Sequence, residues 1–201
     1  MTILLTGCAG FIGSHTTKAL LQKGYNVIGV DNLNDYYNPA WKKQNLTKFE
    51  NENNFTFNRL DITDQAALEQ IFNQQEQNEP IQKIVHLAAR AGVRASIEQP
   101  LLYQKVNVEG TLNLLELARK YQVKQFVFAS TSSIYGAQKK IPFSETDPVN
   151  EPVSPYAATK KAAEMLCYTY SHLHKLKVTC LRFFTVYGPA GRPDMAPYLF
   201  T

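Results

Sequence analysis

The stretch TILLTGCAGFIG, residues 2–13, decides the fold of this chain. Five residues typical of a buried strand are followed by three glycines spaced GxxGxxG, and helical periodicity begins at residue 11. Glycine is required where the backbone turns with positive φ, or where a side chain would collide with a bound diphosphate. The amino end of a helix offers such an anion free N–H groups and the positive end of the helix dipole. Strand, glycines and helix in this order predict a dinucleotide-binding unit, although glycines alone would also suit ordinary turns.

Strand-like and helix-like segments alternate along the rest of the chain. Helices are expected over 11–23, from 64, over 101–121 and over 155–173, and strands over 25–30, 55–60, 81–88, 124–129 and 177–183. Residues 32–54 are expected to form a loop with a short helix. Because each strand is apolar throughout, we predict an α/β fold: a doubly wound, Rossmann-like parallel sheet that helices cover on both faces. We expect residues 1–190 to form this domain and residues 191–201 to begin a substrate-binding region whose remainder is missing.

Composition narrows the class of protein. Hydrophobic residues make up 44% of the 201, enough for one sizeable core. The net charge of +4 comes from scattered residues, and no platform of aromatic and basic side chains indicates a nucleic-acid partner. The apolar runs are too short to span a membrane, and the amino terminus lacks the basic region of a signal peptide. Three cysteines without a CxxC pair indicate neither a disulfide framework nor a metal site, so we expect a cytoplasmic setting.

Asp31 ends the second strand, 18 residues after Gly13. An acidic residue at this place accepts hydrogen bonds from both ribose hydroxyls of NAD and repels the 2′-phosphate of NADP. Since no arginine stands beside Asp31 in the sequence, NAD is the expected cofactor, although Asp31 and Asn32 would also suit the start of a turn. Asp61 and Ile62 follow the third strand, where the carboxylate either reaches the adenine amine or caps a turn.

Tyr156 and Lys160, spaced YxxxK at the start of a helix, are the candidate catalytic pair. This four-residue spacing puts both side chains on one face. A phenol has a pKa of about 10, and it acts as a base near neutrality only where a cation stabilises its anion. We expect Lys160, the nicotinamide charge and the helix amino end to lower the pKa of Tyr156 together.

A run of hydroxyl residues, Ser130 to Ser133, leaves the fifth strand at its carboxyl end. Open α/β sheets bind their ligands at that end, so a hydroxyl here can hold the oxygen that is oxidised. The alternative is a turn in which these side chains satisfy their own backbone.

The chain resembles the extended short-chain dehydrogenase/reductase family along its whole length. The resemblance is carried by the glycine loop, HLAA at 86–89, Asn107 in VNVEGT, the hydroxyl run and YxxxK. Three stretches are more specific and resemble the UDP-glucuronate 4-epimerases: DNLNDYY at 31–37, AGVR at 91–94, and RFFTVYGP with GRPDM over 182–195. Arg90 and Ala190 depart from the pattern expected there.

This resemblance implies a role for each matching residue. Tyr156 takes the proton from the sugar's O4 while hydride passes from C4 to NAD, Lys160 holds the nicotinamide ribose, and Thr131 hydrogen-bonds O4. Return of the hydride to the other face of the 4-keto sugar inverts C4. The implied cofactor site consists of Gly7, Gly10, Phe11, Ile12, Gly13, Asp31, Asn32, Asp61, Ile62, Leu87, Ala88, Ala89, Asn107, Ser130, Tyr156 and Lys160. The implied substrate site consists of Arg94, Thr131, Ser132, Ser133, Tyr156, Thr185 and Arg192.

Serines stand at 132 and 133, where similar dehydratases and decarboxylases place carboxylates. Without such an acid–base pair elimination lacks its catalyst. Our hypothesis is that Ser132, Ser133, Thr185 and Arg192 hold the sugar carboxylate in an orientation unproductive for loss of CO₂. Arg192 would otherwise be an exposed loop residue. Arg94 contacts the substrate or the diphosphate, or else it forms a surface ion pair.

Several functions stay open at this point. The first is C4 inversion of UDP-glucuronate, and close to it are another UDP- or dTDP-sugar 4-epimerase, a 4,6-dehydratase and a decarboxylase. A non-catalytic NAD-binding module is the alternative of another class. The family resemblance also implies a homodimer through the helices at 101–121 and 155–173, and because family members continue past residue 201, we expect poor turnover from this chain alone.

Overall fold

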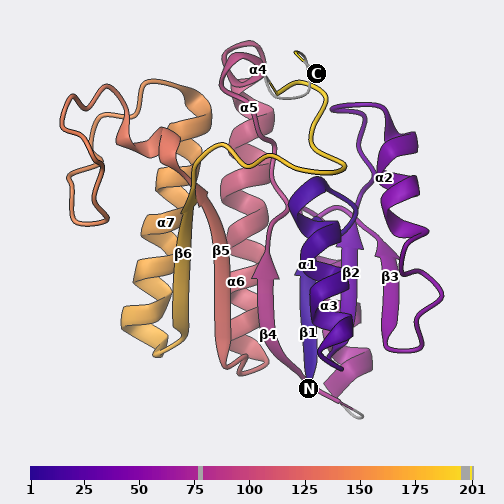
Figure 1. The fold of residues 1–201 in the computed structure, drawn as a ribbon. Helices are drawn as coiled ribbons and strands as arrows, with labels where there is room; N and C mark the ends of the chain where they lie inside the picture. The colour runs from indigo at the N-terminus through magenta and orange to yellow at the C-terminus, as the bar shows by residue number, and fades with distance from the viewer. Residues whose placement is uncertain (77–78, 196–199, 201) are drawn as a thin grey trace.

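The computed structural model describes residues 1–76, 79–195 and 200. These residues form a six-stranded, parallel sheet in the order β3-β2-β1-β4-β5-β6. Its strands are β1 (Thr2–Thr6), β2 (Asn26–Asp31), β3 (Phe55–Arg59), β4 (Ile81–His86), β5 (Gln125–Thr131) and β6 (Lys177–Phe183). The strand order reverses between β1 and β4, and doubly wound sheets bind ligands at the carboxyl ends of such a switch point. The predicted Rossmann-like sheet is confirmed (Figure 1).

Two hydrophobic cores lie on opposite faces of the sheet. On one face, α1 (Phe11–Gln22) and α2 (Pro39–Leu46) pack on side chains such as Leu5 and Val27. On the other, α3 (Gln65–Glu76), α6 (Gly110–Lys120) and α7 (Pro155–His174) pack on the alternate side chains, among them Leu4 and Phe126. Successive residues of a strand point to opposite faces, so a strand between these layers must be apolar throughout, as β1 is.

The prediction that both faces are covered is wrong for β6. None of its seven residues is buried, and Leu181 is 38% exposed, whereas every residue of β1 is buried. Figure 1 shows α7 behind β6, while no helix of the described residues lies in front of β5 and β6. The sequence of β6, KVTCLRF, contains Lys177, Thr179 and Arg182, so this edge strand is not apolar throughout as predicted.

The predicted helix over 101–121 is interrupted. It consists of α5 (Pro100–Tyr103), a π-helical segment η1 (Gln104–Glu109) and α6, and the unpredicted helix α4 (Val93–Glu98) precedes it. The π segment carries Asn107, whose side chain accepts a hydrogen bond from Arg90 N (2.8 Å) and donates one to Arg90 O (3.0 Å). Such bulges often occur at functional sites, and here one ties η1 to the segment after β4.

Helix ends follow the predicted capping residues. Ser154 Oγ accepts a hydrogen bond from Ala157 N (3.1 Å), with Pro155 in the first turn of α7. Asp64 Oδ1 accepts one from Ala67 N (3.0 Å) before α3. Within the described ranges, no helix combines the length and the apolar character needed to cross a membrane.

The segment after β6 returns across the carboxyl ends of the strands. In Figure 1 it is the yellow coil that runs from β6 towards α1 and α2. His15 Nε2 lies 2.8 Å from Pro189 O, and Arg192 contacts Tyr36 in the loop before α2. Residues distant in sequence therefore meet at the edge where ligands are expected, and the predicted domain boundary at residue 190 stays a prediction.

Candidate functional site

The glycine turn is closely packed against the end of β4. Gly7 has φ of +75°, and a Cβ there would lie 2.8 Å from Ala88 N. A Cβ on Gly13 would overlap the Gly7 carbonyl oxygen. Gly10 occupies the N-cap of α1 without a side-chain hydrogen bond, so no capping side chain competes for the N–H groups of Phe11 and Ile12. This cradle fits a diphosphate, which needs close backbone approach and a helix amino end.

Asp31 lies beside this turn and is 6% exposed. Its Oδ2 accepts a hydrogen bond from Ala9 N (3.2 Å), and its Oδ1 accepts one from Leu33 N (2.8 Å). The carboxylate therefore starts the turn that was its alternative role, and its contact with the ribose stays a prediction. Lys42, likewise buried, places Nζ 3.4 Å from Asp31 Oδ1. This cation escaped the sequence prediction because it arrives through a loop and a helix, eleven residues further along.

The predicted site residues after β3 and β4 mainly form turns and pack in the core around the site. Asp61 accepts hydrogen bonds from Thr63 N (2.9 Å) and Asn32 Nδ2 (2.6 Å), so it caps a turn and fixes Asn32. Burial acts to raise the pKa of Asp61, but these hydrogen bonds outweigh it and the net pKa is lowered. Ile62 is buried in the core against Gly110. Leu87, Ala88 and Ala89 follow β4 beside the glycine turn.

The hydroxyl run lies at the carboxyl end of β5. Thr131 Oγ1 accepts a hydrogen bond from Ser133 N (3.1 Å) and caps the short 3₁₀ helix η2 (Ser132–Tyr135). Ser130 is 3% exposed, and its Oγ has no hydrogen-bond partner among the described residues. A buried hydroxyl without a partner costs free energy unless a ligand or water satisfies it. Ser130 therefore fits a polar ligand group at this end of the strand, as the predicted cofactor would supply.

Tyr156 and Lys160 lie on α7 as predicted, but Lys160 does not contribute the expected lowering of the Tyr156 pKa. Burial raises the pKa of Tyr156, while a hydrogen bond with Thr131 and the charge of Arg192 act to lower it. Lys160 is 2% exposed, its Nζ lies 4.1 Å from the centroid of the Phe128 ring, and burial lowers its pKa to about 8. The ammonium is turned into the core, and Arg192 is the cation that acts to lower the pKa of Tyr156.

The predicted substrate residues differ in how firmly they are held. Arg192 is not a free loop residue, because Nε and Nη2 bind Asp194 Oδ1 (3.0 Å) and Oδ2 (2.5 Å). Thr185 is exposed in the segment after β6. Arg94 is exposed on α4, and no carboxylate of the described residues forms an ion pair with it.

Two contact residues of Arg192 were missed from the sequence. Tyr36 accepts a hydrogen bond from Arg192 Nη2 (3.4 Å) and donates one to Asp194 Oδ2 (3.2 Å). Both residues stand in stretches that carry the family resemblance, DNLNDYY and GRPDM, and that was the only signal available. Their separation of 158 residues hides the contact itself.

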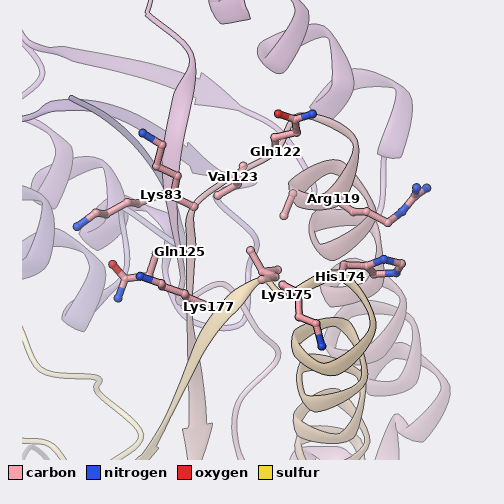
Figure 2. Close-up of a pocket in the computed structure, with 11 residues that line it drawn as sticks. Lys83, Arg119, Gln122, Val123, Gln125, His174, Lys175 and Lys177 are labelled. Atoms are coloured by element: carbon pink, nitrogen blue, oxygen red, sulfur yellow. The ribbon is translucent and has the colours of Figure 1, made fainter.

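A cavity of about 570 Å³ lies at the opposite edge of the sheet, between the turns that precede β5 and β6 (Figure 2). Its lining includes Lys83, Arg119, Lys124, Lys175 and Lys177 but none of the predicted site residues. We place the functional site at the carboxyl ends instead, because the glycine turn, Ser130 and Tyr156 converge there. Nowhere in residues 1–76 and 79–195 do three or more His, Cys, Asp or Glu side chains gather as metal ligands.

Comparison with known proteins agrees with this geometry. The family profile described as GDP-mannose 4,6 dehydratase matches residues 4–200. The chain belongs to the extended short-chain dehydrogenase/reductase family of NAD-dependent epimerases and dehydratases. It is 52% identical over 197 residues to UDP-glucuronate 4-epimerase of Thermodesulfobacterium geofontis, covering 98% of this chain and 59% of that protein. It is 49% identical over 201 residues to Protein CapI of Staphylococcus aureus, covering 100% and 59%.

Solved structures of the family share the fold. UDP-glucuronic acid 4-epimerase of Bacillus cereus, in complex with UDP-glucuronic acid and NAD, matches with a TM-score of 0.86 and 38% identity over 98% of this chain and 61% of that one. The DesIV dTDP-glucose 4,6-dehydratase of Streptomyces venezuelae, with NAD bound, matches with a TM-score of 0.88 and 32% identity over 100% and 61%. NAD, the cofactor predicted from the sequence, is the one these proteins hold. The chain spans about three fifths of the length of these relatives.

Proposed function

We propose that this chain is the NAD-binding and catalytic part of a nucleotide-sugar 4-epimerase that acts on UDP-glucuronate. The observation that carries the proposal is the buried, unpartnered Ser130 hydroxyl at the carboxyl end of β5, on the same sheet edge as the closely packed glycine turn and the amino end of α7 with Tyr156. Relatives named UDP-glucuronate 4-epimerase, 45–52% identical across the chain, support the sugar.

The side chains at this edge suit removal of a proton from a sugar hydroxyl. NAD supplies the acceptor and later the donor of a hydride at the same carbon. Tyr156 is the base for the O4 proton, and Thr131 holds the same oxygen through its hydroxyl. Because burial raises the pKa of Tyr156, its phenolate needs positive charge nearby, and Arg192 contributes part of it.

Arg192 and the hydroxyl run also suit a sugar carboxylate. A guanidinium binds a planar carboxylate through two parallel hydrogen bonds. Ser132 and Ser133 lie beside Thr131, with Thr131 Oγ1 donating to Ser133 Oγ (3.2 Å). These groups would hold the carboxylate of a 4-keto glucuronate, a β-keto acid, in an orientation that disfavours loss of CO₂.

A 4,6-dehydratase is the second candidate, because the dehydratase DesIV matches this fold with a TM-score of 0.88. The residues after Thr131 favour the epimerase. Elimination needs an acid and a base near C5 and C6, and the sequence places two serines there. A decarboxylase would likewise differ at these positions.

We further propose a cytoplasmic homodimer. Large apolar side chains are exposed on the two helices that the family resemblance implies for the interface, with Leu101 84% exposed on α5 and Tyr168 67% exposed on α7. Met165, 49% exposed, lies one helical turn before Tyr168. Exposed apolar side chains at helical spacing fit burial against a second copy.

NMR of the products formed by the complete gene product from UDP-glucuronate and NAD tests the function. We expect a C4-inverted uronate, whereas a 4-keto-6-deoxy sugar or a pentose would show a dehydratase or a decarboxylase. Tyr156→Phe should lower kcat about a thousandfold, as expected for loss of a general base. Tyr25→Phe, one residue before β2 at the opposite edge of the sheet, is the matched control and should keep full activity. Equal activity of Tyr156→Phe and the parent would contradict the assignment.

A further inference from the structure

One edge of the Arg192 guanidinium is hydrogen-bonded by Asp194 and Tyr36, which come from two distant parts of the chain. Asp194 binds Nε and Nη2 side-on at 3.0 and 2.5 Å, and Nη2 also donates to the Tyr36 hydroxyl. The Tyr36 ring lies under the guanidinium, with its centroid 5.3 Å from Cζ. Asp194 and Tyr36 are themselves hydrogen-bonded, so the three side chains form a closed network.

Tyr36 is itself fixed from both sides. In the loop before Tyr36, three backbone N–H groups each donate a hydrogen bond to the side-chain oxygen two residues earlier. The donors are Leu33, Asn34 and Tyr36, and the acceptors are Asp31 Oδ1, Asn32 Oδ1 and Asn34 Oδ1, at 2.8, 3.0 and 3.2 Å respectively. On the other side, the Tyr36 hydroxyl lies against Gly92, where a Cβ would overlap it. The AGVR and DNLNDYY stretches therefore meet at this hydroxyl. Tyr36 is a rigid support and not a solvent-exposed loop side chain.

The network leaves part of the guanidinium unused. An arginine has five N–H donors, of which Nε carries one and each Nη carries two. Asp194 and Tyr36 take the Nε donor and both Nη2 donors. Nη1 donates to no residue in the described part of the chain, so two donors remain. The network lies near Tyr156: the hydroxyls of Tyr36 and Tyr103 both lie beside Gly92, and the Tyr103 ring centroid is 6.2 Å from that of Tyr156. In agreement with this placement, the charge of Arg192 acts to lower the pKa of Tyr156.

We propose that Asp194 and Tyr36 are positioning residues that hold Arg192 by one edge and present Nη1 to the carboxylate of a uronate, so that they set the preference for uronates over neutral hexoses. The inference rests on the proposed function, because that function places the sugar at Tyr156. A long arginine side chain loses much rotamer freedom when it binds, and prior fixing by Asp194 and Tyr36 removes most of that cost. A neutral hexose makes no ionic contact with Nη1 and gains nothing from this fixing.

Binding of two sugars to variants of the NAD-loaded complete gene product tests this. Calorimetry with UDP-glucuronate and UDP-glucose separates recognition of the carboxylate from general binding. Asp194→Asn should weaken UDP-glucuronate about tenfold and Tyr36→Phe about threefold, as expected for loss of a charged and of a neutral hydrogen-bonded support. UDP-glucose should change less than about twofold, and the uronate KM should rise while kcat stays nearly constant.

Matched controls come from the same loop. Asp35→Asn and Tyr37→Phe change neighbouring residues that make no hydrogen bond with Arg192 among the described residues, and they should leave the uronate preference unchanged. An equal loss for both sugars in Asp194→Asn would mean a merely structural role and would overturn the proposal. Tighter uronate binding in Asp194→Asn would also overturn it, because Asp194 would then compete with the substrate. If the parent inverts C4 but Asp194→Asn keeps its uronate preference, only this inference fails; if the parent inverts no sugar, the proposed function itself fails.

Discussion

The centre of the sheet at β1 and its edge at β6 differ in how their residues are held. At β1 and the glycine turn, every strand residue is buried and the turn is defined by backbone contacts, such as Gly7 against Ala88. At β6, no residue is buried, and the segment that follows it is held by side chains, above all Arg192, Asp194 and Tyr36. The β1 region offers backbone donors to a cofactor that many proteins share. The segment after β6 offers side chains that can change without disturbing the core. We therefore infer that the β1 region binds the cofactor and that the segment after β6 sets the sugar preference.

The largest expected effect compares two leucines of the sheet. Leu5 in β1 is fully buried, and Leu181 in β6 is 38% exposed. Leu5→Ala should lower the free energy of unfolding by about 3 kcal/mol, because it leaves a cavity in a packed core, and Leu181→Ala by less than about 1 kcal/mol. Urea unfolding of the two variants measures the difference. Similar losses would show that β6 is as well covered as β1 in solution.

Two glycines with the same φ test how far the turn depends on close packing. Gly7 and Gly24 both have φ of +75°, but a Cβ on Gly24 meets nothing within 4 Å. Gly24→Ala should cost about 1 kcal/mol of stability for the strained backbone, and Gly7→Ala about 2 kcal/mol more because of its contact with Ala88. Gly7→Ala should also abolish NAD binding in calorimetry, while Gly24→Ala binds normally. If both variants bind NAD equally well, the turn is not the diphosphate site.

The pH dependence of the free energy of unfolding tests whether the Lys160 ammonium is buried as deeply as the residues of β1. Burial lowers the pKa of Lys160 to about 8, below the ordinary 10.5. Between these values the unfolded chain binds more protons than the folded one, so stability should rise with pH, by about 2 kcal/mol from pH 8 to 10. Lys160→Met should lack this rise in urea unfolding at each pH, and Lys161→Met, its neighbour on α7, should keep it. A rise that persists in Lys160→Met would mean that the ammonium is hydrated.

The smallest effect concerns cofactor choice beside Asp31. Asp31→Asn removes the carboxylate that we expect to repel a 2′-phosphate, and it leaves Lys42 without its ion pair. NAD binding should weaken about tenfold, and NADP binding should strengthen by less than that. Adding Lys42→Met should cancel the gain for NADP in calorimetry. A gain that survives in the double variant would show that Lys42 lies out of reach of the 2′ position.

The local patterns that predicted the fold are short-range. The strand at 2–6, the positive φ of Gly7 and the Ser154 cap before Pro155 each depend on residues that are neighbours in sequence, and the structure confirms these three. The roles of the glycine motif and of the YxxxK pair stay predictions. The π segment at Asn107 could not be predicted, because hydrogen bonds with Arg90, seventeen residues away in sequence, accompany it. The expected lowering of the Tyr156 pKa by Lys160 failed for a similar reason, since the rotamer of Lys160 depends on Phe128 in β5.

Sequence by itself determined the class of fold and named the candidate site residues, because periodicity and glycine placement act over a few residues. Only the tertiary structure decided which groups meet: Lys42 beside Asp31, Tyr36 beside Asp194, and Arg192 as the cation that acts on Tyr156. These contacts join segments up to 158 residues apart, and their charges interact through space and not along the chain. The same distinction separates the exposed β6 from the buried β1, since burial depends on which helices cover a strand as well as on its own residues.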